Sequence, residues 1–368
     1  MTSIVACGDV AVRRSDCASM FTGCRETLQA ADLCFAQLEA PISERGSKAP
    51  NARLAMRAPM AMAPALRDAG IDVVSLAGNH CLDFGYEALT DTLQHLAQAG
   101  VGACGAGEDL PTALRPACLQ AGAHRIAIIA ACSILPEGYA AGAGKPGCAP
   151  LRAFTVYEPV EPDQPGTPPR TRTFARREDL DALIDCVRAA REAADCVLVS
   201  LHWGIHMIPF VLADYQIEVA HALIDAGADA ILGHHPHLLK GVELYRGRPV
   251  FYSLGNFAIE QPHVWDPAIL QSSSFRHLVS LHPEWDLGGR FMMPESTRPT
   301  GLAKLILHQD GKLESRFCPA WIGDDSTPRM LRAGEPQFET VRRFLEESSE
   351  KAGFGTRFRV EDDELTLA

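Results

Sequence analysis

The chain has 368 residues, of which 47% are hydrophobic, and its formal net charge at pH 7 is −12. This composition is typical of a soluble globular protein with enough apolar material for one large domain or two smaller ones. The negative charge argues against sequence-independent binding to nucleic acid, and no apolar run approaches the length of a membrane span.

The N-terminus and the cysteines both favour a cytoplasmic protein. Residues 1–10 lack the charged start and the long apolar core of a secretion signal, so we expect neither export nor a membrane anchor. The twelve cysteines are scattered singly, without a Cys-x-x-Cys pair, and several lie in apolar runs. This pattern predicts mostly buried thiols in a reducing compartment.

Apolar strands alternate with helical segments along most of the chain. We expect strands at residues 3–9, 33–39, 71–77, 125–131, 196–202 and 229–232, and helices at residues 24–31, 60–69, 86–99, 177–194 and 212–226. Two hairpins follow, at 242–254 and 302–317, and then a helix at 337–351 and an acidic tail. Such alternation is typical of an α/β layered fold.

The order of the predicted strands and helices suggests one main domain over residues 1–330. Two stretches inside it, about 135–170 and 261–300, read as irregular insertions, and the first is dominated by glycine and proline. Residues 331–368 are expected to form a C-terminal helix and an acidic tail that pack on the domain or trail it.

Polar side chains stand at the carboxyl ends of five predicted strands. These residues are Asp9, Glu39, Asn79, His202 and His235. Sites in open α/β sheets assemble at that edge, although strand ends are often polar without any function. His235 belongs to the run Gly233-His234-His235-Pro236-His237, in which three imidazoles share four positions. Oxygen and imidazole ligands without thiolate suit Mn, Fe, Zn or Mg in a catalytic site, and His237 adds enough ligands for two ions.

Six motifs resemble, in order, those of the poly-gamma-glutamate capsule-assembly (CapA-like) family. They are Gly8-Asp9-Val10, Gln37-Leu38-Glu39-Ala40-Pro41, Ser75-Leu76-Ala77-Gly78-Asn79-His80 with Asp83-Phe84-Gly85, Ser200-Leu201-His202-Trp203-Gly204, Gly233-His234-His235-Pro236-His237 and Tyr252-Ser253-Leu254-Gly255-Asn256-Phe257. The resemblance covers residues 4 to 260 and implies a four-layered α/β/β/α sandwich of the metallophosphoesterase type, with a two-metal site at its strand ends.

The resemblance also implies roles for individual residues. The implied metal ligands are Asp9, Glu39, Asn79, His202, His235 and His237. They would bind one or two divalent transition-metal ions, with Mn, Fe or Zn expected. His80 would be a general acid or stabilise substrate charge, and Asp83 would either orient His80 or cap the helix that follows it. Ala11 stands where the wider superfamily has a histidine ligand, so a single ion is also compatible with the sequence.

Five further residues are candidate substrate contacts or extra ligands, namely His206, His234, Trp203, Asn256 and Arg57. Each has a plainer alternative: His206 could be a loop histidine, Trp203 a packing residue and Arg57 a solvated charge. His263, His277 and His282 could form a lid over the site or lie on the surface.

The sequence therefore predicts a soluble metal-dependent hydrolase with a metal-bound hydroxide as the nucleophile. The bond could be a phosphoester, or a carboxylic ester, lactone or amide, including a gamma-glutamyl amide, in a small-molecule or gamma-glutamyl substrate. The alternative is a non-catalytic accessory protein of poly-gamma-glutamate capsule synthesis or export. The oligomeric state stays open.

Overall fold

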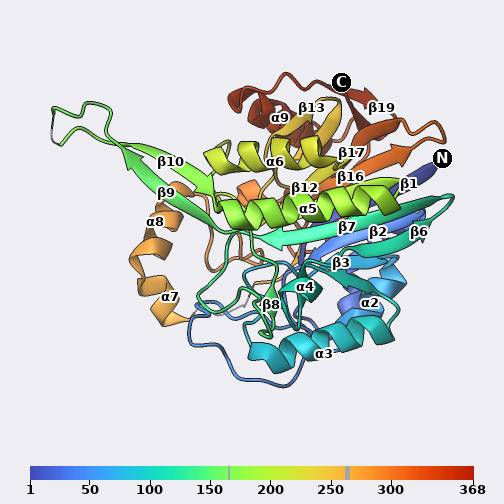
Figure 1. Cartoon of the computed structure of the whole chain (residues 1–368), viewed down its shortest axis with the longest axis horizontal. Coiled ribbons are helices and arrows are strands. Elements are labelled where there is room, and N and C mark those ends of the chain that lie inside the picture. Colours follow the sequence, from blue (N-terminus) through green and yellow to red (C-terminus); the bar gives the residue numbers. More distant parts are fainter. Residues whose placement is uncertain (165, 262–265) are drawn as a thin grey trace.

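Two β-sheets stacked face to face form the centre of the molecule (Figure 1). The structure is a computed structural model that describes the whole chain except residues 165 and 262–265. Buried residues of both sheets belong to one hydrophobic cluster, which places the main core between the sheets.

The first sheet has ten strands. Its main path runs β19-β20-β17-β16-β1-β2-β3-β4, with β15 paired to β1 and β18 to β17. The bounds are β1 Thr2–Ala11, β2 Leu33–Leu38, β3 Val73–Ser75, β4 Gly102–Cys104, β15 Asn256–Ile259, β16 Pro299–Leu307, β17 Leu313–Ile322, β18 Pro328–Met330, β19 Phe358–Glu361 and β20 Glu364–Leu367. Strands β1 to β4 are parallel, so their carboxyl ends lie at one edge.

The second sheet has six strands in the order β13-β14-β12-β11-β7-β6. The bounds are β6 Ala117–Ala121, β7 His124–Cys132, β11 Cys196–His202, β12 Ala230–His234, β13 Val242–Tyr245 and β14 Arg248–Phe251. Its central strands β7, β11 and β12 are parallel and almost entirely buried, which explains their near-continuous apolar sequences.

Helices cover the outer faces of both sheets. The bounds are α1 Arg25–Gln29, α2 Met62–Ala69, α3 Gly85–Gln98, α4 Leu110–Ala113, α5 Arg177–Ala193, α6 Asp214–Ala226, α7 Pro267–Gln271, α8 Ser273–Leu281 and α9 Pro336–Lys351, with short 3₁₀ helices η1 Cys17–Phe21 and η2 Glu295–Thr297. Helices α5 and α6 lie over the second sheet, and α2 and α3 lie beyond the first (Figure 1). The predicted α/β/β/α layering is therefore confirmed.

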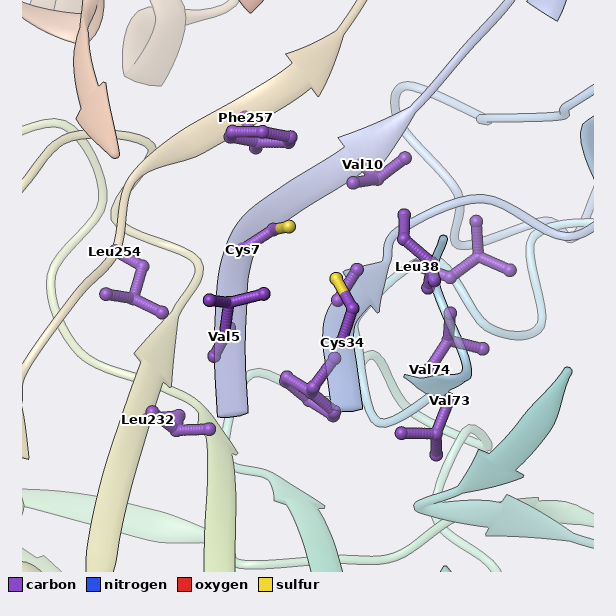
Figure 2. Close-up of a cluster of buried hydrophobic side chains, with 14 of the residues drawn as sticks. Val5, Cys7, Val10, Cys34, Leu38, Val73, Val74, Leu232, Leu254 and Phe257 are labelled. Atoms are coloured by element: carbon purple, nitrogen blue, oxygen red, sulfur yellow. The ribbon is translucent and has the colours of Figure 1, made fainter. Parts of the chain in front are cut away.

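Part of the main hydrophobic cluster is drawn in Figure 2. Leu232 of β12 belongs to the same buried cluster as Val5 and Cys7 of β1, and Val73 of β3 extends the cluster along the first sheet. Figure 2 also shows Phe257 of β15 beside β1. Because this cluster includes residues of β1 and β12, which lie more than 200 residues apart in the chain, it holds the second sheet against the first.

Alternation along β11 and β12 decides which side chains face the first sheet. Leu198 and Leu232 pack in the core between the sheets, whereas Val199 and Ile231 pack under α5 and α6. Side chains of a strand alternate between its faces, so even-numbered residues at the ends of β11 and β12 also point between the sheets.

Three stretches have more regular structure than the sequence suggested. The first expected irregular insertion, 135–170, contains β8 Gly147–Cys148 and also β9 Ala153–Glu158, which pairs with β10 Arg170–Ala175 in a projecting hairpin (Figure 1). The second, 261–300, contains α7, α8 and η2. The acidic tail forms β19 and β20, which extend the first sheet through β17. The pairing of β20 with β17 joins segments that are distant in the chain, which local composition does not reveal.

Strand β15 was also missed, because its partner is remote in the chain. Asn256–Ile259 pairs in parallel with β1, and the two chains approach so closely that a Cβ on Gly8 would lie 2.1 Å from the Gly255 carbonyl oxygen. Among the helices of the described ranges, none combines the length and the apolar character that crossing a bilayer requires.

Candidate metal centre

Four strand ends bring carboxylates and imidazoles together between the sheets. Asp9 lies on β1 and Glu39 directly follows β2, and both come from the first sheet. His202 ends β11 and His234 ends β12 of the second sheet, on the face that points toward the first. All four side chains are buried, with 3% exposure or less.

The turn after β12 adds His235 and His237 in a strained backbone. Both residues have positive φ angles, 93° and 58°, which residues other than glycine rarely adopt. The backbone N–H of His235 donates to Asp9 Oδ2 at 3.1 Å, and His237 Nδ1 lies 2.8 Å from Asn256 Oδ1. Because an amide oxygen accepts, Nδ1 carries the proton, and His237 Nε2 is left as a free lone pair.

Two ligand sets share Glu39. In one, ligand atoms of Glu39, His202 and His235 lie within 4.8 Å of one another; in the other, those of Asp9, Glu39 and His237 do. Glu39 Oε1 is 3.5 Å from His202 Nε2 and 3.7 Å from His237 Nε2. Glu39 could therefore contribute a ligand to either of two neighbouring cation sites.

Burial and mutual charge set the protonation of this cluster. Burial, together with the charges of Asp9 and Asp83, raises the pKa of Glu39 well above its usual range. Burial also opposes ionisation of Asp9, but the adjacent histidines, His234 foremost, lower its pKa below the ordinary value. Burial lowers the pKa of His202 to about 3, so its imidazole is neutral, as a metal ligand requires.

The residues fit a divalent cation, because several buried ligand atoms have no other partner. Asp9 Oδ1, Glu39 Oε1, His202 Nδ1 and His235 Nδ1 make no hydrogen bond with any described residue. His234 Nδ1 lies 3.2 Å from Asp9 Oδ1 but without the alignment of a hydrogen bond. Buried polar atoms without partners are costly, and a cation held by these oxygens and nitrogens would satisfy them.

His80 and Asp83 form a hydrogen-bonded pair beside this cluster. His80 Nδ1 lies 2.6 Å from Asp83 Oδ2, which also accepts from the backbone N–H of Met56 at 2.7 Å. The hydroxyl of Tyr139 donates to Asp83 Oδ1 at 3.1 Å. Asp83 is buried, and its carboxylate is used to orient His80; it does not cap α3, whose N-cap is Phe84 and has no side-chain hydrogen bond.

His80 lies next to the cluster. It follows Asn79, whose Oδ1 lies 2.6 Å from His202 Nε2. Its side chain is 15% exposed, and its charge contributes to the electrostatics of His202 and His235. Asp83 engages Nδ1, and no hydrogen bond of His80 Nε2 is found among the described residues.

The other candidates divide into those near the cluster and those in packing roles. Asn256 orients His237, and His234 lies against Asp9. Trp203 is fully buried; its ring stacks on Tyr252 at 5.9 Å and its Nε1 donates to the Tyr252 carbonyl, so it is a core residue.

The guanidinium of Arg57 contacts a loop and an aromatic ring, and no contact with the cluster is found among the described residues. Its guanidinium donates to the carbonyls of Glu44, Arg45 and Gly46 and lies 3.5 Å above the ring centroid of Phe84. These contacts fix the loop beside Asp83.

The remaining histidines have different surroundings. His206 packs against His235 and His237. His277 is exposed on α8, His282 is buried, and His263 lies outside the described residues.

Sequence reasoning missed Tyr139 and Lys240. Tyr139 lies in the glycine-rich stretch expected to be irregular, and nothing in that pattern connects it with Asp83. Lys240 is 1% exposed, although lysine is rarely buried without a paired acid. Only its position, three residues after His237, could have indicated that Lys240 lies near the cluster.

Comparisons with known proteins show what the chain is similar to. The family model described as bacterial capsule synthesis protein PGA_cap matches residues 3–261. A probable polyglutamine synthesis accessory protein of Mycobacterium tuberculosis is 35% identical over 231 residues, or 62% of this chain and 55% of the relative. The PGA biosynthesis protein CapA of Bacillus subtilis is 29% identical over 66% of this chain and 57% of its own length. The chain thus spans little more than half the length of these relatives.

Solved structures are similar at lower identity. The calcineurin-like phosphoesterase YfkN of Bacillus subtilis aligns with a TM-score of 0.41 and 14% identity, over 95% of this chain and 98% of the other.

Proposed function

Since the chain belongs to the bacterial capsule synthesis protein family, we propose that it is a metal-dependent hydrolase. The observation that carries the proposal is the buried cluster of two carboxylates and three imidazoles, in which four buried oxygen and nitrogen atoms form no hydrogen bond with the described residues. One or two divalent ions would be held by Asp9, Glu39, His202, His235 and His237. Mn, Fe and Zn suit oxygen and imidazole ligands without thiolate.

A bound divalent ion supplies a Lewis acid, which acidifies a water molecule and polarises the bond to be cleaved. The chain's own residues do the rest. Glu39 and Asp9 place negative charge against the ion, and Asn256 keeps His237 Nε2 unprotonated. Asp83 accepts the Nδ1 proton of His80 and favours the doubly protonated imidazolium, whose Nε2 proton can pass to the leaving group and leave a neutral ring.

The substrate we propose is a small molecule or a gamma-glutamyl compound. A phosphoester, a carboxylic ester, a lactone and an amide would all use the same metal centre and the same proton donor. We place gamma-glutamyl amides first in a screen, because the relatives are named for polyglutamine and PGA synthesis.

The second candidate is an accessory role in capsule polymer synthesis without catalysis. The name of the mycobacterial relative, a probable polyglutamine synthesis accessory protein, favours it. A non-catalytic partner does not need a buried carboxylate that orients a histidine beside the cluster, whereas a hydrolase does. The His80–Asp83 pair therefore favours the hydrolase over the accessory role.

The test combines elemental analysis with a hydrolysis screen of the purified protein. Phosphomonoesters, phosphodiesters, lactones and gamma-glutamyl amides are assayed with the wild type, His235→Ala, His80→Asn and the control His277→Gln, whose histidine is exposed on α8. We expect His235→Ala to lose metal, and His80→Asn to keep metal but lose at least about 100-fold in kcat.

Each failure has a distinct meaning. A wild type that neither contains nor binds a divalent ion would refute the hydrolase. Metal bound normally, with no hydrolysis of any tested bond and no effect of His80→Asn, would favour the accessory role.

A further inference from the structure

The loop between β11 and α6, residues 204–213, carries His206 to the candidate metal centre. The His206 ring centroid lies 5.3 Å from that of His235, nearly parallel to it at 30°, and 5.1 Å from that of His237, edge-on at 80°. His206 belongs to neither ligand set. It therefore borders the centre where a molecule bound to the ligands would lie.

This loop does not hold its shape through its own backbone preferences. Met207 and Phe210 have positive φ angles, 51° and 64°. Bulky residues rarely adopt this conformation, and it persists only where the surrounding structure imposes it. Something must therefore hold the loop.

Lys240 makes the central contacts that hold it. Its side chain is 1% exposed, and its Nζ donates to the carbonyls of Ile208 and Val211, the latter at 2.9 Å. No ion pair of Lys240 is found among the described residues. Burying the amino group of a lysine without an acid is costly, and its hydrogen bonds to the two loop carbonyls offset that cost.

Two more hydrogen bonds tie the same loop to the centre. The backbone N–H of Met207 donates to the Pro236 carbonyl at 3.0 Å, within the His-Pro-His turn. The carbonyl of Met207 accepts from Nε2 of the buried His282 at 2.7 Å. Lys240 follows the same turn by three residues, so the ligand turn and the His206 loop are locked to each other.

We propose that Lys240 is a positioning residue that holds the 204–213 loop in place, so that His206 contacts an anionic substrate oxygen at the metal centre. The contact with substrate rests on the proposed function, whereas the position of the loop does not. A neutral imidazole can donate one hydrogen bond to such an oxygen.

The first experiment tests the position in the metal-free protein. Histidine ring ¹H–¹³C NMR signals are compared between the wild type and Lys240→Met, with His206→Ala used to assign the His206 signal. The matched control is Lys351→Met, because Lys351 Nζ touches the same loop from outside, 3.9 Å above the ring centroid of Phe210, and is half-exposed.

We expect Lys240→Met to shift or broaden the signals of His206, His235 and His237, and Lys351→Met to leave them unchanged. Unchanged signals in a folded Lys240→Met would overturn the proposal. If Lys240→Met does not fold, Lys240→Gln keeps an N–H donor on a shorter side chain, and the same comparison decides.

The second experiment tests the contact with Mn²⁺ and orthophosphate as probes. Calorimetric titration measures Mn²⁺ binding, and then phosphate binding to the Mn²⁺-loaded protein. We expect His206→Ala and Lys240→Met each to keep Mn²⁺ and to weaken phosphate binding by about tenfold, with the double variant no weaker than either.

Additive losses in the double variant, about 100-fold in all, would show that Lys240 does not act through His206. Phosphate binding that is unchanged in His206→Ala would also refute the contact. Absence of Mn²⁺ binding in the wild type would instead refute the proposed function. The NMR comparison would still decide whether Lys240 holds the 204–213 loop in position.

Discussion

The metal-free protein is expected to lose stability steeply in mild acid. Burial lowers the pKa of both His202 and His206 from 6.5 to about 3. The unfolded chain therefore binds a proton at each of these residues below pH 6.5, whereas the native protein does so only near pH 3. Because the unfolded state binds more protons, the free energy of unfolding falls as the pH falls through 6.5.

The magnitude follows from these values. Between pH 7.5 and 5.5 each of the two histidines should remove about 1.4 kcal/mol from the free energy of unfolding, and the pair about 3 kcal/mol. Burial also lowers the pKa of His235 and His237, so they act in the same direction. Glu39 acts in the opposite direction, because its raised pKa lets the native protein keep a proton that the unfolded chain releases. Domains are typically stable by only about 5–15 kcal/mol, so the loss should be easy to measure.

The assay is urea unfolding of chelator-treated protein at pH 7.5, 6.5 and 5.5. The variant His206→Gln should lose about 1.4 kcal/mol less than the wild type over this range. The control His277→Gln replaces a histidine exposed on α8 and should follow the wild type. The same loss in His206→Gln as in the wild type would refute the assignment of a buried neutral imidazole at His206.

Three further substitutions test other contacts. Glu39→Gln should raise the melting temperature of the metal-free protein at pH 8, because burial raises the pKa of Glu39 and disfavours its charge. The same substitution should abolish stabilisation by Mn²⁺. Calorimetry that shows a lower melting temperature for the metal-free variant would contradict the first expectation. Asp83→Ala leaves three donors without an acceptor and should cost about 3 kcal/mol in urea unfolding, and a loss below about 1 kcal/mol would speak against the hydrogen bonds described. Gly233→Ala would place a Cβ 2.2 Å from the Tyr252 carbonyl oxygen and should cost about 3 kcal/mol, whereas Gly355→Ala, with no atom within 4 Å of the new Cβ, should be nearly neutral by the same measurement.

The ligand cluster could be predicted because its signals are local. Asp9, Glu39 and His202 each end a short apolar run, and strand ends of one sheet edge converge whatever the rest of the fold does. The same logic gave the layered architecture, since helices and strands alternate along the chain.

Residues that act through distant contacts could not be predicted in this way. Tyr139 reaches Asp83 across 56 residues, and Lys240 reaches Ile208 across 32. Neither has a sequence pattern of its own, because a hydroxyl or an ammonium becomes informative only once its acceptor is known. The pairing of β15 with β1 could not be predicted for the same reason, because its two strands are distant in the chain.

The origin of the ligands from two sheets has a consequence for the order of assembly. The first sheet contributes Asp9 and Glu39, and the second contributes His202, His235 and His237. Each half alone holds only carboxylates or only imidazoles, so the complete set exists only after the sheets have docked. We therefore expect metal loading to follow docking during folding, and a bound ion to slow the separation of the two sheets when the protein unfolds.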